Sequence, residues 1–318
     1  MNASARRALS VAALIIVSGL RLAARLLPFP LTRAIGRAAG LVVCGVLHKR
    51  RRLARDQVCA ALGVNRAEGA RVVRRMFLHF GESVAELLGL ADAEVEETRR
   101  VEGLDHLHRA LDLGRGALFV TAHLGNFELA VRGASWVGRP VSVLSKRFTS
   151  PLSQMIWRRL RLGGPTILDS AVSGRETLAA LRRNEVVVFV LDQHDPGRRA
   201  VILPFFGRPA ATSAALSRAA RLSGAPVLPV FTARKGGRHV VTVGAPLGVS
   251  ATGSPRELAQ ILTAEATNAI EAAIREAPEQ WLWLHRRWKV SGSSGAGTGA
   301  SEPRGGPPDS TGTRPQSG

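Results

Sequence analysis

A histidine and a glutamate five residues apart, His123 and Glu128, are the residues best placed to do chemistry. The apolar run from Gly116 to Ala122 is typical of a strand and delivers His123 to a Gly-Asn turn, after which a helix-like pattern begins. On one ideal helix the two side chains would lie about 140° apart. With His123 at the strand end and Glu128 in the first helical turn they can converge, the carboxylate orienting the imidazole and stabilising its protonated form.

The sequence around this pair offers no serine or cysteine nucleophile elbow. The histidine would therefore deprotonate a hydroxyl of the substrate rather than one of the enzyme. The same pair also fits a solvated histidine beside a glutamate at a helix start, with no catalytic role.

A second carboxylate, Asp192, closes the apolar strand-like run Val186–Leu191. In α/β sheets, ligand groups usually lie at the carboxyl ends of the strands. Asp192 could order an active-site loop or contact a sugar hydroxyl. It could equally cap the turn through Asp195-Pro196-Gly197, which has the composition of a tight turn.

Strand-like and helix-like runs alternate along the middle of the chain, which predicts an α/β fold with a mixed, mainly parallel central sheet flanked by helices. The expected helices are 127–135, 151–162, 174–184, 212–222 and 255–277, after a helical stretch at 67–90. The expected strands are 117–120, 141–144, 166–168, 186–191, 201–205, 227–231 and 240–243.

Five segments, in this order, resemble the bacterial lipid A late acyltransferases, the lauroyl and myristoyl transferases within the glycerolipid acyltransferase superfamily. The resemblance covers about residues 20 to 290. The last segment, with three tryptophans among basic residues, is the most specific. The five segments are His-Leu-Gly-Asn-Phe-Glu at 123–128, Leu-Asp-Gln-His-Asp-Pro-Gly at 191–197, Leu-Pro-Phe-Phe-Gly-Arg-Pro-Ala-Ala-Thr at 203–212, Ser-Gly-Ala-Pro-Val-Leu-Pro at 223–229 and Pro-Glu-Gln-Trp-Leu-Trp-Leu-His-Arg-Arg-Trp-Lys at 278–289.

The resemblance implies a glycerolipid acyltransferase-like fold and an O-acyltransferase that moves a fatty acyl chain from a thioester to a hydroxyl of a lipid A-type glycolipid. Such transfer needs a base, donors for the developing oxyanion and a slot for the chain. His123 would be the base and Glu128 its orienter. Gly125 and Asn126 would open the helix, so that free backbone N–H groups lie beside the reacting carbonyl.

Two further groups are expected to bind substrate. The family has an Arg-x-x-x-Asn-Pro-like block associated with phosphate binding; here Lys146 and Arg147 stand at that place, and Ser150 replaces the asparagine. Lysine is a weaker bidentate clamp than arginine, and a solvated basic loop is the alternative. Phe206, Gly207 and Arg208 place apolar surface beside a cation, which suits an acyl chain next to a phosphate, although phenylalanines at a strand end also fit plain core.

The net charge of +20 indicates an anionic partner. Residues 1–55 carry eleven Lys or Arg and no acid, threaded through apolar sequence. That pattern favours anionic membrane lipids over nucleic acid, for which no zinc-finger or RNA-binding signature is present. The expected partners are therefore anionic lipids, a glycolipid acceptor and acyl carrier protein, with no metal or cofactor beyond the acyl thioester of acyl carrier protein or coenzyme A.

The amino terminus predicts a membrane-associated helical segment. Arg6 and Arg7 precede the apolar run Ala8–Leu20, which is short for a span, and Arg21 and Arg25 continue an amphipathic pattern. Without a clean cleavage site, the segment fits an uncleaved tilted anchor or an interfacial helix. The positive-inside rule then places the body at the cytoplasmic face of the cell inner membrane.

The expected organisation is a basic membrane-anchoring segment at 1–56, an acyltransferase domain at 57–290 and a disordered Gly/Ser/Pro-rich tail at 291–318. Cys44 and Cys59 have no metal-type spacing and read as small core residues. Two alternative functions stay open. The first is acylation of a lysophospholipid, or of another glycolipid such as a phosphoinositide mannoside, and the second is a non-catalytic basic protein that binds membranes or nucleic acid.

Overall fold

A computed structural model describes most of the chain. The described residues are 3–132, 134–145, 165–169, 173–197, 200–248 and 253–289. Three sequence-based expectations lie outside them: the phosphate-binding pair Lys146 and Arg147, the helix at 151–162 and the tail at 291–318.

Seven strands of the described chain form one sheet, and every neighbouring pair except β8–β9 is parallel. This confirms the predicted mixed, mainly parallel sheet. Across the sheet the strands are β1 (Arg99–Glu102), β9 (Arg238–Val243), β8 (Val227–Lys235), β2 (Ala117–Thr121), β5 (Val186–Val190), β3 (Val141–Ser145) and β4 (Thr166–Asp169).

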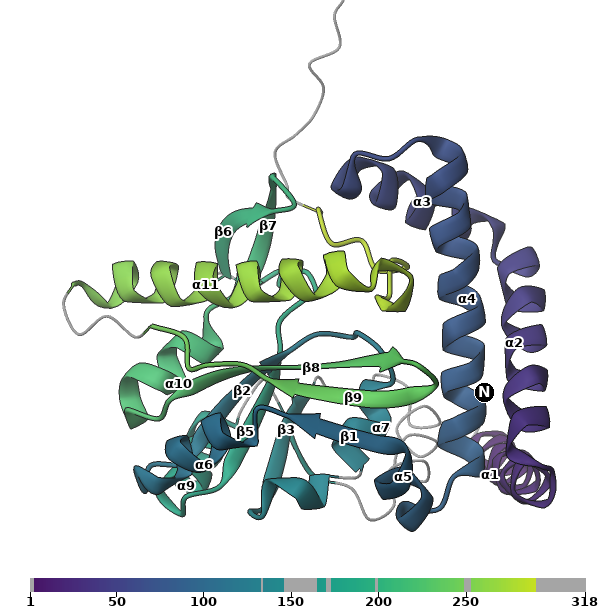
Figure 1. Cartoon of the computed structure of the whole chain (residues 1–318), viewed down its shortest axis with the longest axis horizontal. Helices are drawn as coiled ribbons and strands as arrows, with labels where there is room; N and C mark the ends of the chain where they lie inside the picture. Colours follow the sequence, from purple (N-terminus) through teal and green to yellow (C-terminus); the bar gives the residue numbers. More distant parts are fainter. Residues whose placement is uncertain are drawn as a thin grey trace, which may run out of the picture.

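Helices cover both faces of this sheet (Figure 1). Because side chains alternate along a strand, Leu118 and Val120 of the central strand β2 face one core and Phe119 faces the other. The first core contains α9 (Gly174–Arg182), α10 (Ala215–Ser223) and α11 (Pro255–Glu276). The second core contains α6 (Leu104–Asp112) and the short helices α7 (Phe127–Arg132) and η1 (Ala134–Val137).

Four helices precede the sheet and stand at one end of it (Figure 1). They are α1 (Ala3–Leu26), α2 (Phe29–Val46), α3 (His48–Leu62) and α4 (Arg66–Gly89), and α5 (Asp92–Thr98) connects them to β1. The predicted domain boundary at residue 56 falls inside α3.

The helices α2 and α4 are packed backbone against backbone. A Cβ on Gly40 would lie 2.1 Å from the carbonyl oxygen of Phe77, and one on Gly81 would lie 2.1 Å from that of Gly36. Because only glycine allows this approach, the buried face of α2 is fixed against α4. Within the described residues, α2 is the helix that is long and apolar enough to cross a membrane, by length and composition only. The sequence instead predicts the membrane anchor in the preceding apolar run, Ala8–Leu20, which belongs to α1.

A separate antiparallel hairpin pairs β6 (Ala200–Phe205) with β7 (Arg208–Ser213) and packs on α11. The helix predicted at 212–222 is present as α10 (Ala215–Ser223), but its predicted start is wrong. Thr212 lies in β7, where its hydroxyl accepts a hydrogen bond from the buried Arg287. The helix α10 begins three residues later than expected, because residues 208–213 complete the hairpin.

Candidate active site

The imidazole of His123 is held by a buried carboxylate from the neighbouring strand. His123 follows β2 and Asp192 follows β5, and because these strands pair in parallel their carboxyl ends meet. Asp192 Oδ1 accepts a hydrogen bond from His123 Nδ1 at 2.8 Å, and Oδ2 accepts the His123 backbone N–H at 3.0 Å. This contact sets Nδ1 as the protonated ring nitrogen, so that Nε2 is the atom suited to take a proton from a substrate.

A tryptophan from the carboxyl-terminal segment completes the environment of Asp192. Trp281 Nε1 donates to Asp192 Oδ2 at 2.7 Å, and the backbone N–H of Leu282 donates to the carbonyl of His123 at 3.3 Å. Burial alone would raise the pKa of Asp192. The neighbouring His123 imidazole and the hydrogen bonds from His123 and Trp281 outweigh burial and lower this pKa, so the carboxylate stays ionised.

Asp192 is buried, but His123 is not. The side chain of His123 is 22% exposed, against 2% for Asp192. The ring of Phe127 meets the imidazole edge-on at 4.8 Å, and Gln193 Nε2 lies 3.4 Å from both ring nitrogens. The arrangement is therefore an accessible imidazole backed by a sequestered carboxylate, which is the geometry of a general base.

Glu128, predicted to orient His123, lies in the first turn of α7 and is buried. The predicted strand–turn–helix arrangement is therefore present. However, the contact that fixes the imidazole tautomer is made by Asp192, 69 residues away in the sequence. The catalytic role of Glu128 stays a prediction.

Gly125 closes the turn between β2 and α7. Its φ of +61° is the left-handed conformation that favours glycine, and an added Cβ would lie 2.2 Å from the carbonyl oxygen of Thr232. The N–H of Gly125 was expected to face a reacting carbonyl. It instead donates to the carbonyl oxygen of Gln280 at 3.0 Å, which ties the turn to the carboxyl-terminal segment.

The side chain of Asn126 is directed into the protein rather than towards a substrate. It is buried, and its Nδ2 donates to the carbonyl of Ser83 at 3.2 Å and to Glu86 Oε2 at 3.0 Å, both on α4. Its backbone carbonyl accepts the N–H groups of Leu129 and Ala130 in α7. Asn126 therefore anchors the turn between β2 and α7 to α4. Its predicted contact with a substrate stays a prediction.

Glu86 is the centre of a buried group of charges, which we call the Glu86 cluster: Arg33, Glu82, Glu86, Arg234 and His239. Glu86 accepts from Arg234 Nη2 at 2.8 Å and lies 3.1 Å from His239 Nε2. Burial raises the pKa of Glu86, but hydrogen bonds and charges from His239 and Arg234 outweigh it and lower the pKa to about 2. The cluster joins α2 and α4 to the β8–β9 hairpin.

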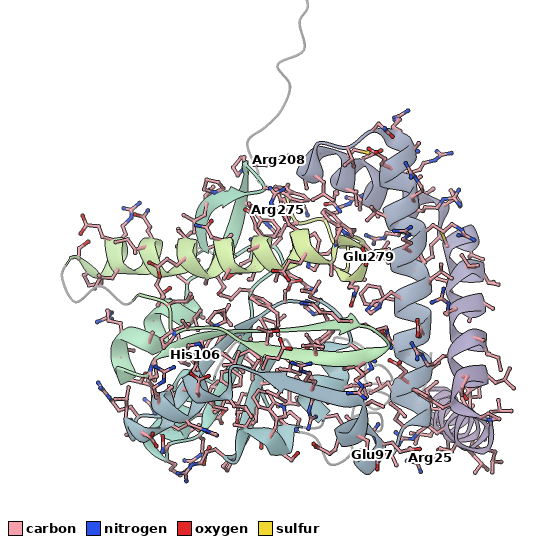
Figure 2. The ribbon with its side chains drawn as sticks, viewed as in Figure 1. Arg25, Glu97, His106, Arg208, Arg275 and Glu279 are labelled. Carbon is pink, nitrogen blue, oxygen red and sulfur yellow. The ribbon has the colours of Figure 1, made fainter. Side chains whose placement is uncertain are left out.

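The residues expected to bind an acyl chain next to a phosphate, Phe206–Arg208, lie in the β6–β7 hairpin rather than at His123. Phe206 is buried, with its ring 6.1 Å from that of Trp283 and the guanidinium of Arg275 4.6 Å above it. Gly207 forms the exposed turn, and Arg208, at the tip of the hairpin (Figure 2), has its guanidinium 4.9 Å from the ring of Trp288. The predicted substrate contacts of Phe206, Gly207 and Arg208 stay predictions, and the structure uses Phe206 as aromatic core.

Besides Trp281, two residues of the carboxyl-terminal segment lie beside the site although the sequence did not predict them there. Arg287 is fully buried and donates to the carbonyl oxygens of Gln193 and Ala211 at 3.2 and 2.6 Å, and burial lowers its pKa to about 10. His285 Nε2 accepts the N–H of His194 at 3.0 Å. Both hold the loop that carries Asp192. In the sequence, only their place in the basic, tryptophan-rich block pointed to them. The block does not indicate which of its cations is buried.

No group of three or more His, Cys, Asp or Glu side chains in the described part of the chain has the arrangement of a metal site.

Comparisons with known proteins point to one family. A family model described as bacterial lipid A biosynthesis acyltransferase matches residues 2–290. The chain is similar to the lipid A biosynthesis palmitoleoyltransferase of Escherichia coli, with 30% identity over 83% of this chain and 87% of that protein. It is 28% identical to the lipid A biosynthesis lauroyltransferase of the same organism, over the same shares of the two chains. A lipid A biosynthesis acyltransferase of Haemophilus influenzae is 22% identical over 67% of each chain.

Proposed function

The chain belongs to the bacterial lipid A biosynthesis acyltransferase family, and we propose that His123 is the general base with which it transfers a fatty acyl chain from a thioester to a hydroxyl of a lipid A precursor. Membership makes the chain an acyltransferase of lipid A biosynthesis, in agreement with the resemblance seen in the sequence. The observation that carries the assignment of His123 is the partly exposed imidazole held through Nδ1 by the buried, ionised Asp192.

The proposed reaction begins at Nε2 of His123, which accepts the proton of the acceptor hydroxyl. The acceptor oxygen attacks the thioester carbonyl, a C–O bond forms, and the C–S bond breaks. The departing thiolate takes the proton back from the imidazolium, so that the histidine is regenerated. Asp192 keeps the ring oriented and stabilises the transient imidazolium, which is the role a buried carboxylate has beside a catalytic histidine.

The donor and the remaining substrate contacts belong to the same proposal. The thioester is proposed to be that of acyl carrier protein, with coenzyme A as the alternative carrier. Lys146 and Arg147 are proposed to bind phosphate groups of donor or acceptor, because a flexible ammonium and a planar guanidinium together suit a phosphorylated substrate. Glu128 is proposed to support His123 from the opening turn of α7.

We also propose that the enzyme works at the cytoplasmic face of the inner membrane. The outer sides of α1 and α2 carry large exposed apolar residues, among them Ile16, Leu26, Val42 and Val46. Arginines and a lysine follow at the start of α3, the pattern of a helix pair that rests in an anionic leaflet.

The reaction is tested by incubating the purified, membrane-reconstituted protein with labelled acyl carrier protein or acyl coenzyme A thioesters and a lipid A precursor, and analysing the lipids by mass spectrometry. A precursor that gains one acyl chain is the expected product. Absence of any acylated glycolipid or lysophospholipid would contradict the proposed function.

The acceptor is identified in a deletion strain. Loss of one acyl chain from lipid A is expected, whereas unchanged lipid A with altered phospholipids would favour the lysophospholipid alternative.

A further inference from the structure

A basic groove lies between α10, α11 and the first residues of β6, and the proposed reaction gives it no role. Water can occupy about 640 Å³ of it, which is the size of a small-molecule binding site. Three arginines line it: Arg218 and Arg221 from α10, and Arg256 from the first turn of α11. None of the described residues that line it is Asp or Glu. We call this feature the Arg218 groove.

Two packed helices set the positions of the three arginines. Arg218 and Arg221 are three residues apart on α10, so their side chains share one face of that helix. Between α10 and α11, the hydroxyl oxygen of the buried Ser217 lies 2.8 Å from that of Thr263. The helix that carries Arg256 is thereby held against the helix that carries the other two arginines. The groove is therefore a feature of the packed fold.

The three arginines are exposed and have no counter-charge among the described residues. Elsewhere on the surface, Arg109 and Arg183 each pair with a carboxylate close to them in the sequence. No such ion pair involves an arginine of the groove within the part of the chain that the structure describes. Glu257, the residue after Arg256, accepts the backbone N–H of Ser254 at 2.8 Å in the cap of α11. Three cations around one hollow repel one another, so a bound anion stabilises the arrangement.

The rest of the lining indicates what else a ligand carries. Val201 and Ile202 of β6 and Pro255 of α11 form an apolar wall, and Ile202 is 59% exposed, so this wall is uncovered in the protein. A guanidinium binds phosphate oxygens through paired, charge-assisted hydrogen bonds. Three guanidinium groups beside an apolar wall therefore suit a ligand with phosphates at one end and an apolar or flat group at the other.

The position of the groove favours a ligand that arrives from water. The helix α10 and the amino-terminal turns of α11 stand at one end of the sheet, and α1 and α2 stand at the other (Figure 1). A headgroup of the leaflet in which α1 and α2 are proposed to rest is therefore badly placed to fill the groove, whereas a dissolved phosphate compound can reach it.

We propose that the Arg218 groove binds a water-soluble organic diphosphate, the chemical class of the nucleoside diphosphates. The phosphates lie between the guanidinium groups of Arg218, Arg221 and Arg256, and the rest of the ligand lies on the apolar wall of Val201 and Ile202. This inference goes beyond the proposed acyl transfer, because the groove shares no residue with the site around His123 and its occupation needs no turnover.

The first experiment measures the affinity of the full chain, held in nanodiscs of neutral lipid, for ADP by isothermal titration calorimetry. Arg218→Gln, Arg221→Gln and Arg256→Gln are each expected to raise Kd by about tenfold or more, the value of one lost charge-assisted hydrogen bond. Arg139→Gln removes an exposed arginine outside the groove and should leave Kd unchanged. Thermal unfolding of each variant checks its folding.

A further variant tests the hollow without changing any charge. Ala259→Phe adds a ring to the lining of the groove, so ADP should bind more weakly although all three arginines remain. Inorganic pyrophosphate, which is smaller, should lose less affinity in this variant.

Three results would overturn the inference. The first is a wild-type protein that does not bind ADP, and the second is equal affinity in the wild type and the three groove variants. The third is a loss in Arg139→Gln as large as the loss in the groove variants, which would show diffuse attraction to the net charge of +20 instead of a site.

Nanodiscs that contain phosphatidylglycerol separate a dissolved ligand from a lipid headgroup. The affinity for ADP is expected to be the same as in neutral nanodiscs. Loss of ADP binding in the anionic nanodiscs alone would show that a lipid headgroup fills the groove, and it would overturn the assignment of a water-soluble ligand.

A last experiment needs no variant. The photoreactive analogue 8-azido-ADP is bound to the wild-type protein, irradiated, and mapped by peptide mass spectrometry. Labels in residues 200–202, 214–221 or 255–260 support the inference, whereas labels confined to the proposed phosphate-binding pair at 146–147 overturn it. A protein that transfers no acyl chain but carries the label in the groove would contradict the proposed function and leave this inference standing.

Discussion

Two buried carboxylates in this protein each hold a histidine, yet their surroundings assign them different tasks. Asp192 binds His123, whose ring is 22% exposed, while Glu86 binds His239, whose side chain is 6% exposed. A carboxylate–imidazole contact is therefore not by itself a sign of catalysis. The accessible ring can exchange a proton with a substrate, and the buried ring can only hold elements together.

The other partners of the two carboxylates show the same difference. Asp192 accepts hydrogen bonds from neutral groups, the His123 backbone and Trp281, and carries a charge that stabilises an imidazolium formed during turnover. Glu86 is already matched by the permanent cation of Arg234 and by the amide of Asn126. Asn126 connects the two regions, because it belongs to the turn of His123 and is anchored by Glu86.

The largest effect is expected for His123→Ala. Removing the base should reduce kcat by about two to four orders of magnitude, the usual contribution of positioned proton transfer. The unfolding temperature should stay close to that of the wild type, since the side chain is partly exposed. His239→Ala is the matched variant: it should lower stability and leave the folded fraction active. A folded His123→Ala protein with near wild-type acyl transfer would contradict the assignment.

The next effect separates the two carboxylates near His123. Asp192→Asn should reduce kcat at least about tenfold, because a neutral amide can no longer stabilise the imidazolium or enforce its tautomer. Glu128→Gln should cost less, since Glu128 does not make the contact that fixes the tautomer. Steady-state kinetics at saturating donor measure both. A larger loss of kcat in Glu128→Gln than in Asp192→Asn would show that Glu128, and not Asp192, is the main group that orients the imidazole.

At the Glu86 cluster the expected effect is on stability. Glu86→Ala removes the nearer of the two carboxylates beside Arg234, leaving Glu82 at 3.6 Å, and leaves the buried His239 Nε2 without its partner. Breaking a buried ion pair of this kind costs about 3–5 kcal/mol of unfolding free energy. Chemical denaturation followed by circular dichroism measures this loss. A change below about 1 kcal/mol would show that the cluster does not hold the helices to the sheet.

The pKa shifts of Glu86 and of His79, which also lies in α4, predict how stability depends on pH. The folded-state pKa of Glu86 is about 2 against an ordinary 4.5, so its contribution is complete above pH 4.5 and is lost as pH falls towards 2. His79 has its pKa lowered to about 4, mainly by burial, and must stay neutral in the fold, so it adds a loss as pH falls from 6.5 to 4. In the His79→Gln protein the loss of stability between pH 6.5 and 4 that is due to His79 should disappear. The loss below pH 4.5 that is due to Glu86 should remain. A stability that does not change between pH 7 and 3 would contradict both assignments.

The smallest effect tests the helix contact that the Glu86 cluster supports. Gly40→Ala would place a Cβ 2.1 Å from the carbonyl oxygen of Phe77 and should destabilise the protein by about 1–3 kcal/mol through overpacking. Gly45→Ala, in the same helix with no atom within 4 Å, should instead stabilise it by up to about 1 kcal/mol. Equal effects of the two substitutions on the unfolding temperature would show that α2 does not pack on α4 in solution.

The sequence by itself determined the local elements and the chemistry. Apolar runs marked the strands of the sheet, because burial on both faces leaves a continuous apolar stretch such as 186–190. The spacing of His123, Gly125 and Glu128 predicted a strand, a turn and a helix in the right place, and the ordered segments predicted the family. The short edge strand β1 and the hairpin strand β7 carried no such signal, because a partly exposed strand lacks the apolar run.

Only the tertiary structure decided which charged groups meet. The contact between His123 and Asp192 depends on β2 and β5 being neighbours in the sheet, although 69 residues separate the pair in the sequence. Glu86 would be read as a solvated helix residue until β8 and β9 bring Arg234 and His239 against it. Periodicity reports which side of an element is buried, but the identity of the partner across a core depends on the order of the strands and the packing of the helices, which local sequence does not encode.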